Sequence, residues 1–185
     1  MKVQETKLKD CFIIHDTVLK DDRGYFFESF NKQRFTDLTG LTPNFVQDNQ
    51  SKSTRGVLRG IHFQQGEHAQ SKLVRVLEGS VLDVAVDLRK SSPTFGEYVA
   101  VELSGNNHVQ LFVPRGFGHA FVVLSSEATF FYKCDNLYNK SSEGGIIYND
   151  TTIGINWQID ASEILLSEKD AALPTLNDTQ DSIHF

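Results

Sequence analysis

Residues 81–88, VLDVAVDL, carry the clearest structural signal in the chain. Apolar residues recur there at every second position, which is the period of a β-strand. One face carries Leu82, Val84, Val86 and Leu88, and the other carries Val81, Asp83, Ala85 and Asp87. Because the first face is wholly apolar and the second holds two carboxylates, we expect a half-buried strand.

Further β-rich runs of similar length lie on both sides of this strand. They are KLVRVLEG (72–79), YVAVEL (98–103), VQLFVP (109–114), AFVVLS (120–125) and TFFYKC (129–134). Turn-forming pairs such as Gly79-Ser80 and Gly105-Asn106 separate them. Short strands at such regular spacing predict an antiparallel sandwich or barrel between Val57 and Cys134.

Two weaker helical patterns flank this block. One covers residues 31–38, and the other covers residues 162–170, where Asp160 and Glu163 resemble the start of a capping box. No repeat or linker interrupts the chain, so we expect one domain over residues 1–185. The residues after Pro174 are mostly polar, and we expect them to be loosely held.

Composition excludes several classes of function. The chain has 185 residues and a formal net charge of -6, so it offers no global positive field for nucleic acid. It has no apolar run long enough for a signal peptide or a membrane span, so we expect a cytoplasmic protein without a membrane partner. Cys11 and Cys134 lie far apart in sequence and predict neither a disulfide nor a thiolate metal site.

Two histidines stand in contexts that resemble the metal ligands of cupin barrels. His62 lies in GVLRGIHFQ (56–64) and His119 in PRGFGHAF (114–121). Gln64 occupies the position where a second histidine would follow His62, and no glutamate completes the set, which leaves too few ligands. We therefore expect no metal and no cofactor. The ordinary interpretation of a single histidine on an apolar strand is a hydrogen-bonded core residue.

Cations near His62 change that interpretation. Arg59 precedes it by three residues, and Lys72 and Arg75 open the next strand. Buried cations are costly unless an anion pairs with them, so a phosphate or carboxylate ligand would explain them; a solvated basic strand face is the alternative. Strict alternation places Arg59 and His62 on opposite faces, so both can point inward only if the strand is irregular, for example through a bulge at Gly60.

Other residues carry less information on their own. Tyr132 alternates with Phe130 and Cys134 and is compatible with an ordinary aromatic core position, while Asp170 is compatible with an exposed acid near a helix end. The chain has no G-x-S-x-G elbow, no P-loop and no G-x-G-x-x-G turn, which removes serine hydrolases, nucleoside triphosphatases and Rossmann enzymes. Ligand binding and proton transfer remain.

Five blocks of the sequence together resemble the dTDP-4-dehydrorhamnose 3,5-epimerase family. They are DDRGYFFESF (21–30), FVQDNQSKSTRGVLRGIHFQ (45–64), QSKLVRVLEGSVLDVAVDLRKSSPTFG (70–96), VPRGFGHAF (113–121) and EGGIIYND (143–150). Their length and order make the resemblance specific over about Asp21 to Asp170. It implies an all-β, cupin-type jelly-roll barrel with a few short peripheral helices, and a homodimer in which N-terminal strand material crosses to the partner.

The resemblance also implies roles for individual residues. His62 is the general base, Asp170 orients it, Tyr132 is the acid on the other side of the sugar, and Lys72 faces the ketone oxygen. Contacts to a dTDP-4-keto-6-deoxy sugar are implied for Arg23, Phe26, Glu28, Gln47, Asn49, Arg59, His119, Tyr138 and Glu143. In the family, a lysine near the position of Asp170 contacts the substrate. In this chain the equivalent residue is either Lys169, which keeps the contact, or Glu168, which removes it.

Three functions remain compatible with these residues. The first is epimerisation at carbons 3 and 5 of the sugar, the second is a 3-epimerase that inverts one carbon of the same substrate, and the third is a non-catalytic cupin that only binds the nucleotide sugar. His62 and Tyr132 together favour a catalyst, because a binding module needs no proton donor and acceptor.

Overall fold

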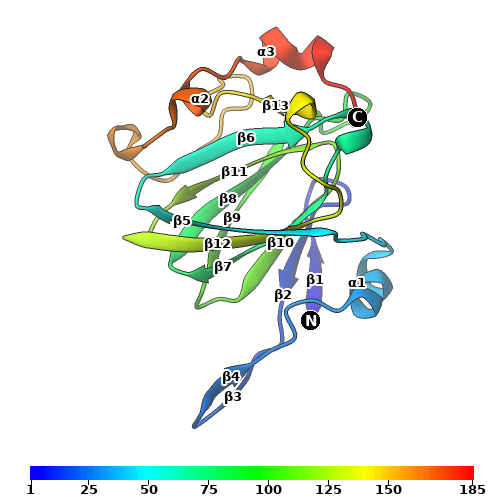
Figure 1. Ribbon diagram of the computed structural model, residues 1–185, viewed down its shortest axis with the longest axis vertical. Helices are drawn as coiled ribbons and strands as arrows, with labels where there is room; N and C mark the ends of the chain where they lie inside the picture. Colours follow the sequence, from blue (N-terminus) through cyan, green and yellow to red (C-terminus); the bar gives the residue numbers. More distant parts are fainter.

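Two antiparallel β-sheets face each other in the computed structural model, which describes residues 1–185 (Figure 1). The six-stranded sheet has the order β1 (Lys2–Glu5), β2 (Phe12–His15), β10 (Val109–Val113), β7 (Lys72–Glu78), β12 (Glu127–Cys134) and β5 (Gln47–Thr54). The five-stranded sheet has the order β13 (Glu143–Gly145), β6 (Leu58–Gln64), β11 (Phe117–Val123), β8 (Ser80–Asp87) and β9 (Tyr98–Ser104). The predicted all-β, cupin-type architecture is confirmed.

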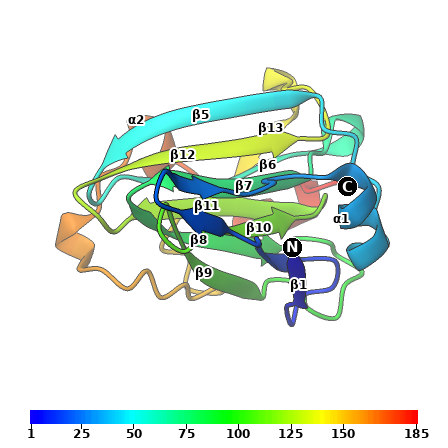
Figure 2. The ribbon, with the colours of Figure 1, turned by 90° about the horizontal axis from the view of Figure 1, so that it is seen from below.

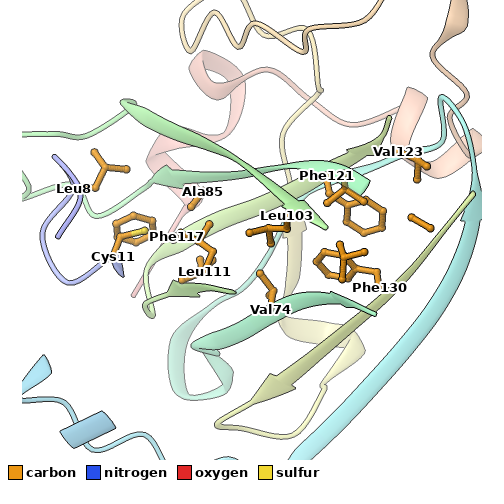
Figure 3. Close-up of a cluster of buried hydrophobic side chains, with 14 residues drawn as sticks. Leu8, Cys11, Val74, Ala85, Leu103, Leu111, Phe117, Phe121, Val123 and Phe130 are labelled. Carbon is orange, nitrogen blue, oxygen red and sulfur yellow. The ribbon is translucent and has the colours of Figure 1, made fainter. Parts of the chain in front are cut away.

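The main core lies between these sheets. Val74 and Phe130 of the six-stranded sheet pack in one cluster with Ala85 and Phe121 of the five-stranded sheet, and the Phe121 and Phe130 rings stack at 4.3 Å. Figure 3 shows this cluster extending from Leu8 at one end to Phe121 and Phe130 at the other. The aromatic end of the core therefore lies beside strands that also carry polar side chains.

Strand β8 is buried on both faces, so the predicted half-buried strand is wrong. Its apolar face packs under the C-terminal third of the chain, which contributes Ile146, Trp157, Leu176 and Ile183 to a second cluster. Its other face points between the sheets, where Asp83 and Asp87 are fully buried. Alternation identified the two faces correctly. It did not show that the C-terminal segment covers one of them.

The C-terminal segment packs more closely than its polar composition predicted. It includes α3 (Leu176–Thr179) and a 3-10 turn (Gln180–Ser182), and Leu176 and Ile183 are each 1% exposed. The Leu176 amide donates to Asp150, and the His184 amide donates to Gln65. In Figure 1 this red segment lies across the outer face of the five-stranded sheet. These contacts differ from the loose attachment that we expected.

The helices are few and short. Helix α1 (Lys32–Thr39) begins at Asn31, whose side chain accepts from the Arg34 amide, as the sequence predicted. The second predicted helix is interrupted. It consists of a 3-10 turn (Ala161–Glu163) and α2 (Glu168–Ala171), because the chain between them extends to form a bridge from Leu165 to Val57. Two further 3-10 turns cover Gly66–His68 and Lys140–Ser142. None of the helices is long and apolar enough to cross a membrane, and the cytoplasmic location stays a prediction.

A small hairpin projects from the body of the molecule. It is formed by β3 (Leu19–Asp21) and β4 (Gly24–Phe26) and lies away from both sheets at the lower end of Figure 1. Tyr25 and Phe26 are 59% and 70% exposed. We refer to residues 16–29 as the arm. Figure 2 shows β12 and β5 side by side at one edge of the six-stranded sheet.

Candidate active site

A cavity of about 320 Å³ opens between the two sheets at the aromatic end of the core. Strands β5, β7 and β12 line it from one sheet, strands β6 and β11 line it from the other, and α2 closes one side. Its lining residues are Asn49, Gln50, Ser51, Arg59, His62, Lys72, His119, Phe121, Phe130, Tyr132 and Asp170. Seven of the residues that the sequence predicted are among these eleven.

Arg59 and His62 both reach this cavity because β6 is irregular between them. His62 pairs with His119 of β11, whereas Arg59 pairs with Phe121, so β6 has one more residue than β11 across this interval. Gly60 lies in the interval with φ of 116°, and the Gly60–Ile61 peptide bond is cis. A Cβ atom on Gly60 would lie 2.5 Å from the His119 carbonyl oxygen. The predicted bulge at Gly60 is therefore confirmed.

His62 forms a short hydrogen bond with Asp170. The distance from its Nε2 to Oδ1 of Asp170 is 2.5 Å, and the other carboxylate oxygen accepts from the Ser167 hydroxyl at 2.9 Å. Ser167 also caps α2 by accepting from the Asp170 amide. A carboxylate accepts hydrogen bonds, so the proton of a neutral His62 ring resides on Nε2 and Nδ1 is left as the base.

Burial and charge act in opposite directions on His62. Burial lowers the pKa of His62 below its ordinary value of 6.5, Asp170 raises it, and the cations Lys72 and Lys169 lower it again. The net result is a lowered pKa, so the ring is neutral at pH 7. A neutral histidine held by a carboxylate is the form that a general base requires.

Tyr132 and Lys72 belong to the six-stranded sheet and so line the cavity from the side opposite His62. The Lys72 Nζ lies 5.7 Å from the centre of the Tyr132 ring. Burial lowers the pKa of Lys72 and raises the pKa of Tyr132. Lys72 takes part in no ion pair within the chain, so its charge is available to an anionic ligand atom.

A second histidine–carboxylate pair adjoins the cavity, which His119 lines and Asp83 does not. The His119 Nε2 is 2.9 Å from Oδ1 of Asp83, and their side chains are 9% and 0% exposed. The His119 ring also stacks on Phe130 at 6.0 Å. Sequence reasoning identified His119 but missed Asp83. Its place on the polar face of VLDVAVDL was the available signal, but that face was expected to meet solvent.

A hydrogen-bonded group adjoins the cavity beside Asn49. Gln47 donates to Asn49 at 3.0 Å and accepts from the Tyr138 amide at 3.2 Å. Tyr138 then donates to Glu143 at 3.0 Å, and Lys169 pairs with the same carboxylate at 2.6 Å. The structure thus brings together Gln47, Tyr138 and Glu143, three further residues that the sequence predicted. It places Lys169 with them.

Four predicted side chains lie elsewhere. Arg23 and Phe26 are on the arm, where Arg23 pairs with Asp21, and Glu28 near the base of the arm pairs with Arg34 at 3.0 Å. Arg75 points to the outer face of its sheet, where its guanidinium lies 5.1 Å from the centre of the Phe27 ring. Arg75 therefore does not join the cations of the cavity, because it is an odd number of residues from Lys72 on a regular strand.

Two of the four remaining lining residues could have been found from the same periodicity. Ser51 follows Asn49 by two residues on β5, and Phe130 precedes Tyr132 by two on β12, so each shares a face with a predicted site residue.

The chain contains no group of three or more His, Cys, Asp or Glu side chains placed to hold a metal ion. The expected absence of a metal remains a prediction, which elemental analysis of the purified protein tests.

Comparison with known proteins places these residues in a family. The model of the dTDP-4-dehydrorhamnose 3,5-epimerase family matches residues 5–178. The dTDP-4-dehydrorhamnose 3,5-epimerase of Salmonella typhimurium is 54% identical over 177 residues, which cover 96% of each chain.

Solved structures of the same family share the fold. The dTDP-4-dehydrorhamnose 3,5-epimerase of Elizabethkingia anophelis superposes with a TM-score of 0.94 at 56% identity, covering 97% of this chain and 98% of that one. The dTDP-6-deoxy-D-glucose-3,5-epimerase of Legionella pneumophila, in complex with dTDP-4-keto-L-rhamnose, has a TM-score of 0.91 at 47% identity and covers 95% and 93%. The chain belongs to the dTDP-4-dehydrorhamnose 3,5-epimerase family.

Proposed function

We propose that this protein converts dTDP-4-dehydro-6-deoxy-D-glucose to dTDP-4-dehydro-L-rhamnose by inverting carbons 3 and 5 of the sugar. The observation that carries the proposal is the arrangement of His62, Lys72 and Tyr132 around one cavity, with His62 held by Asp170. Membership of the epimerase family supports the choice of substrate. The reaction involves no net oxidation, so it needs no redox cofactor.

The chemistry depends on the ketone at carbon 4. A hydrogen on carbon 3 or carbon 5 is acidic because its removal leaves an enolate whose negative charge rests on the ketone oxygen. His62 takes this proton through its unprotonated ring nitrogen, and a general base of this kind contributes roughly 10²- to 10⁴-fold to the rate. The Lys72 ammonium stabilises the oxygen that becomes negative.

Inversion requires a proton from the other face of the sugar. Tyr132 is suited to this step, because it comes from the sheet opposite the one that carries His62. Its raised pKa keeps the hydroxyl protonated at pH 7, so it has a proton to give. A base without an opposing acid would return the proton to the face from which it came and leave the configuration unchanged.

The polar residues around the cavity suit a nucleotide diphosphate. Arg59 bonds only the Ser53 hydroxyl, at 3.2 Å and 3.3 Å, so its guanidinium remains available to bond two oxygens of a pyrophosphate. Tyr138 is 53% exposed and offers an aromatic face to the thymine base. Gln47, Asn49, Glu143 and His119 supply the remaining polar contacts to the nucleotide and the sugar.

A homodimer accounts for the arm. Arg23 and Phe26 are exposed on the hairpin and do not line the cavity of their own subunit, although the family resemblance assigns both to the substrate. If a second copy of the chain provides the arm that reaches this cavity, both observations agree. Glu28 then belongs with the arm, at the point where it joins the body of its own subunit.

Product identification tests the proposal. Purified protein incubated with dTDP-4-dehydro-6-deoxy-D-glucose should yield dTDP-4-dehydro-L-rhamnose, observed by NMR. His62→Asn and Tyr132→Phe should each reduce turnover by at least about a hundredfold. His184→Asn is the matched control, since this exposed histidine lies outside the cavity, and it should retain full activity. Substrate binding without turnover by the unmodified protein would instead support a non-catalytic nucleotide-sugar module.

A further inference from the structure

Asp83 is a buried carboxylate that the proposed reaction does not use. It lies on β8 with no solvent exposure, and one oxygen accepts the hydrogen bond from His119 while the other, Oδ2, has no hydrogen-bond partner. A carboxylate in such a place is costly unless a nearby positive charge compensates for the lost water. A nearby positive charge would therefore stabilise the charged form of Asp83.

Lys72 is the cation that Asp83 influences inside the cavity. Burial is the main cause that lowers the pKa of Lys72, and Cys134, Asp83 and Glu143 oppose it in that order. The Cys134 thiol has a pKa of about 11 and is uncharged at pH 7. Glu143 is already paired with Lys169 at 2.6 Å. Asp83 remains as the carboxylate that no lysine or arginine neutralises.

The other titratable groups that face Lys72 do not replace this charge. Tyr132 is neutral at pH 7 because burial raises its pKa. His62 is neutral as well, and Asp170 is committed to it at 2.5 Å. Loss of the Asp83 charge would therefore leave the Lys72 ammonium without an unpaired anion in its surroundings.

We infer that Asp83 is a positioning residue of the epimerisation site, which fixes the His119 ring through the 2.9 Å contact with Nε2 and places a buried carboxylate oxygen without a hydrogen-bond partner beside the cavity that Lys72 lines. The inference rests on the proposed function, because Lys72 matters only if an enolate oxygen forms beside it. Asp83 touches no substrate in this account. It acts through the two side chains that do.

Asp83→Asn tests this role, because it removes the charge and keeps the size of the side chain. Asp83 raises the pKa of Lys72, so its loss should lower that pKa and move the alkaline limb of the kcat profile to lower pH. We expect kcat to fall about tenfold at pH 7 and further at pH 9. The KM should change less, because most of the proposed nucleotide contacts involve neither Asp83 nor His119.

Asp87→Asn is the matched control. Asp87 is equally buried on the same strand, but its partners Arg89, Ser92 and Thr94 do not line the cavity, whereas His119 does. This variant should lose stability and keep the alkaline limb of the unmodified enzyme. An Asp83→Asn enzyme that turns over substrate with an unchanged alkaline limb would overturn the inference. The proposed function would survive that result, because it depends on turnover by the unmodified enzyme.

A measurement on the unmodified protein covers the case in which Asp83→Asn does not fold. Nitrogen-15 NMR of the histidine rings should show the His119 proton on Nε2 at pH 7. A ring that carries its only proton on Nδ1 would mean that Asp83 is itself protonated and donates to Nε2. Asp83 would then hold no negative charge, and the inference would fail.

Discussion

At the scale of single residues, the protonation state of His62 depends on burial and on charged groups from two other elements. Asp170 on α2 raises the pKa of His62, whereas burial and the Lys72 charge on β7 lower it. The base must be neutral to accept a proton. Activity should therefore be present above the pKa of His62 and disappear as the pH falls through it.

The acid limb of kcat/KM should lie below pH 6.5, the ordinary value for histidine. Asp170→Asn removes a group that raises the pKa of His62, so the limb should move to still lower pH. The rate should fall roughly 10²- to 10⁴-fold, because the amide no longer holds the ring in one orientation. Initial rates from pH 4.5 to pH 9 measure both effects.

Lys169→Gln provides a comparison in which the pKa of His62 should change in the opposite direction. Lys169 lowers the pKa of His62, and its effect is smaller than that of Asp170 or Lys72. Its removal should move the acid limb slightly upward. Limbs that move in the same direction in both variants would show that His62 is not the group whose titration controls the rate.

At the scale of elements, the bulge in β6 allows a base and a phosphate-binding cation to share one cavity. Without the bulge, regular alternation over the three-residue spacing would put Arg59 on the face opposite His62. Gly60 permits the bulge, since its φ of 116° is rarely adopted by other residues and the neighbouring strand leaves no room for a side chain.

Gly60→Ala should therefore destabilise the protein by about 3 kcal/mol, from backbone strain together with overpacking against β11. Urea denaturation followed by circular dichroism measures the loss. Gly66→Ala is the control, because Gly66 has a φ of 60° but no atom within 4 Å of the added Cβ position. It should cost about 1 kcal/mol. Equal losses in the two variants would argue against close packing at Gly60.

At the scale of the whole molecule, local patterns in the sequence predicted part of the site, and the family resemblance supplied further residues of it. Alternation predicted the strands, and the conflict between Arg59 and His62 correctly predicted a bulge. Asp170 could not be placed from local patterns, because its contact with His62 joins residues 108 positions apart. Its position came from the family resemblance, and the structure places it in contact with the histidine.

Other features depended on tertiary packing that no local pattern encodes. The C-terminal segment covers β8 with side chains from distant parts of the chain, so the burial of both faces of that strand could not be read from its own sequence. Likewise, Asp83 looked like a solvent-facing acid, because no residue near it in the sequence indicates that His119 is its hydrogen-bond partner. Polar residues in the interior were the hardest to assign, since their partners come from distant strands.

The arm offers a prediction about assembly. Two inactive variants, His62→Asn and the double variant Arg23→Ala with Phe26→Ala, should restore activity when they are co-expressed with different affinity tags and isolated as a heterodimer. One site then has both defects and the other has none, so about half of the activity should return. A pure heterodimer that stays inactive would show that each arm serves its own subunit, and a monomer in sedimentation would contradict the dimer itself.

Inversion at carbons 3 and 5 requires proton exchange with solvent at both carbons. The reaction in deuterated water measures this exchange directly. We expect a product with one deuterium at carbon 3 and one at carbon 5. We expect neither deuterium when the His62→Asn variant is used in place of the unmodified enzyme. Deuterium at carbon 3 alone would contradict inversion at both carbons and identify a 3-epimerase.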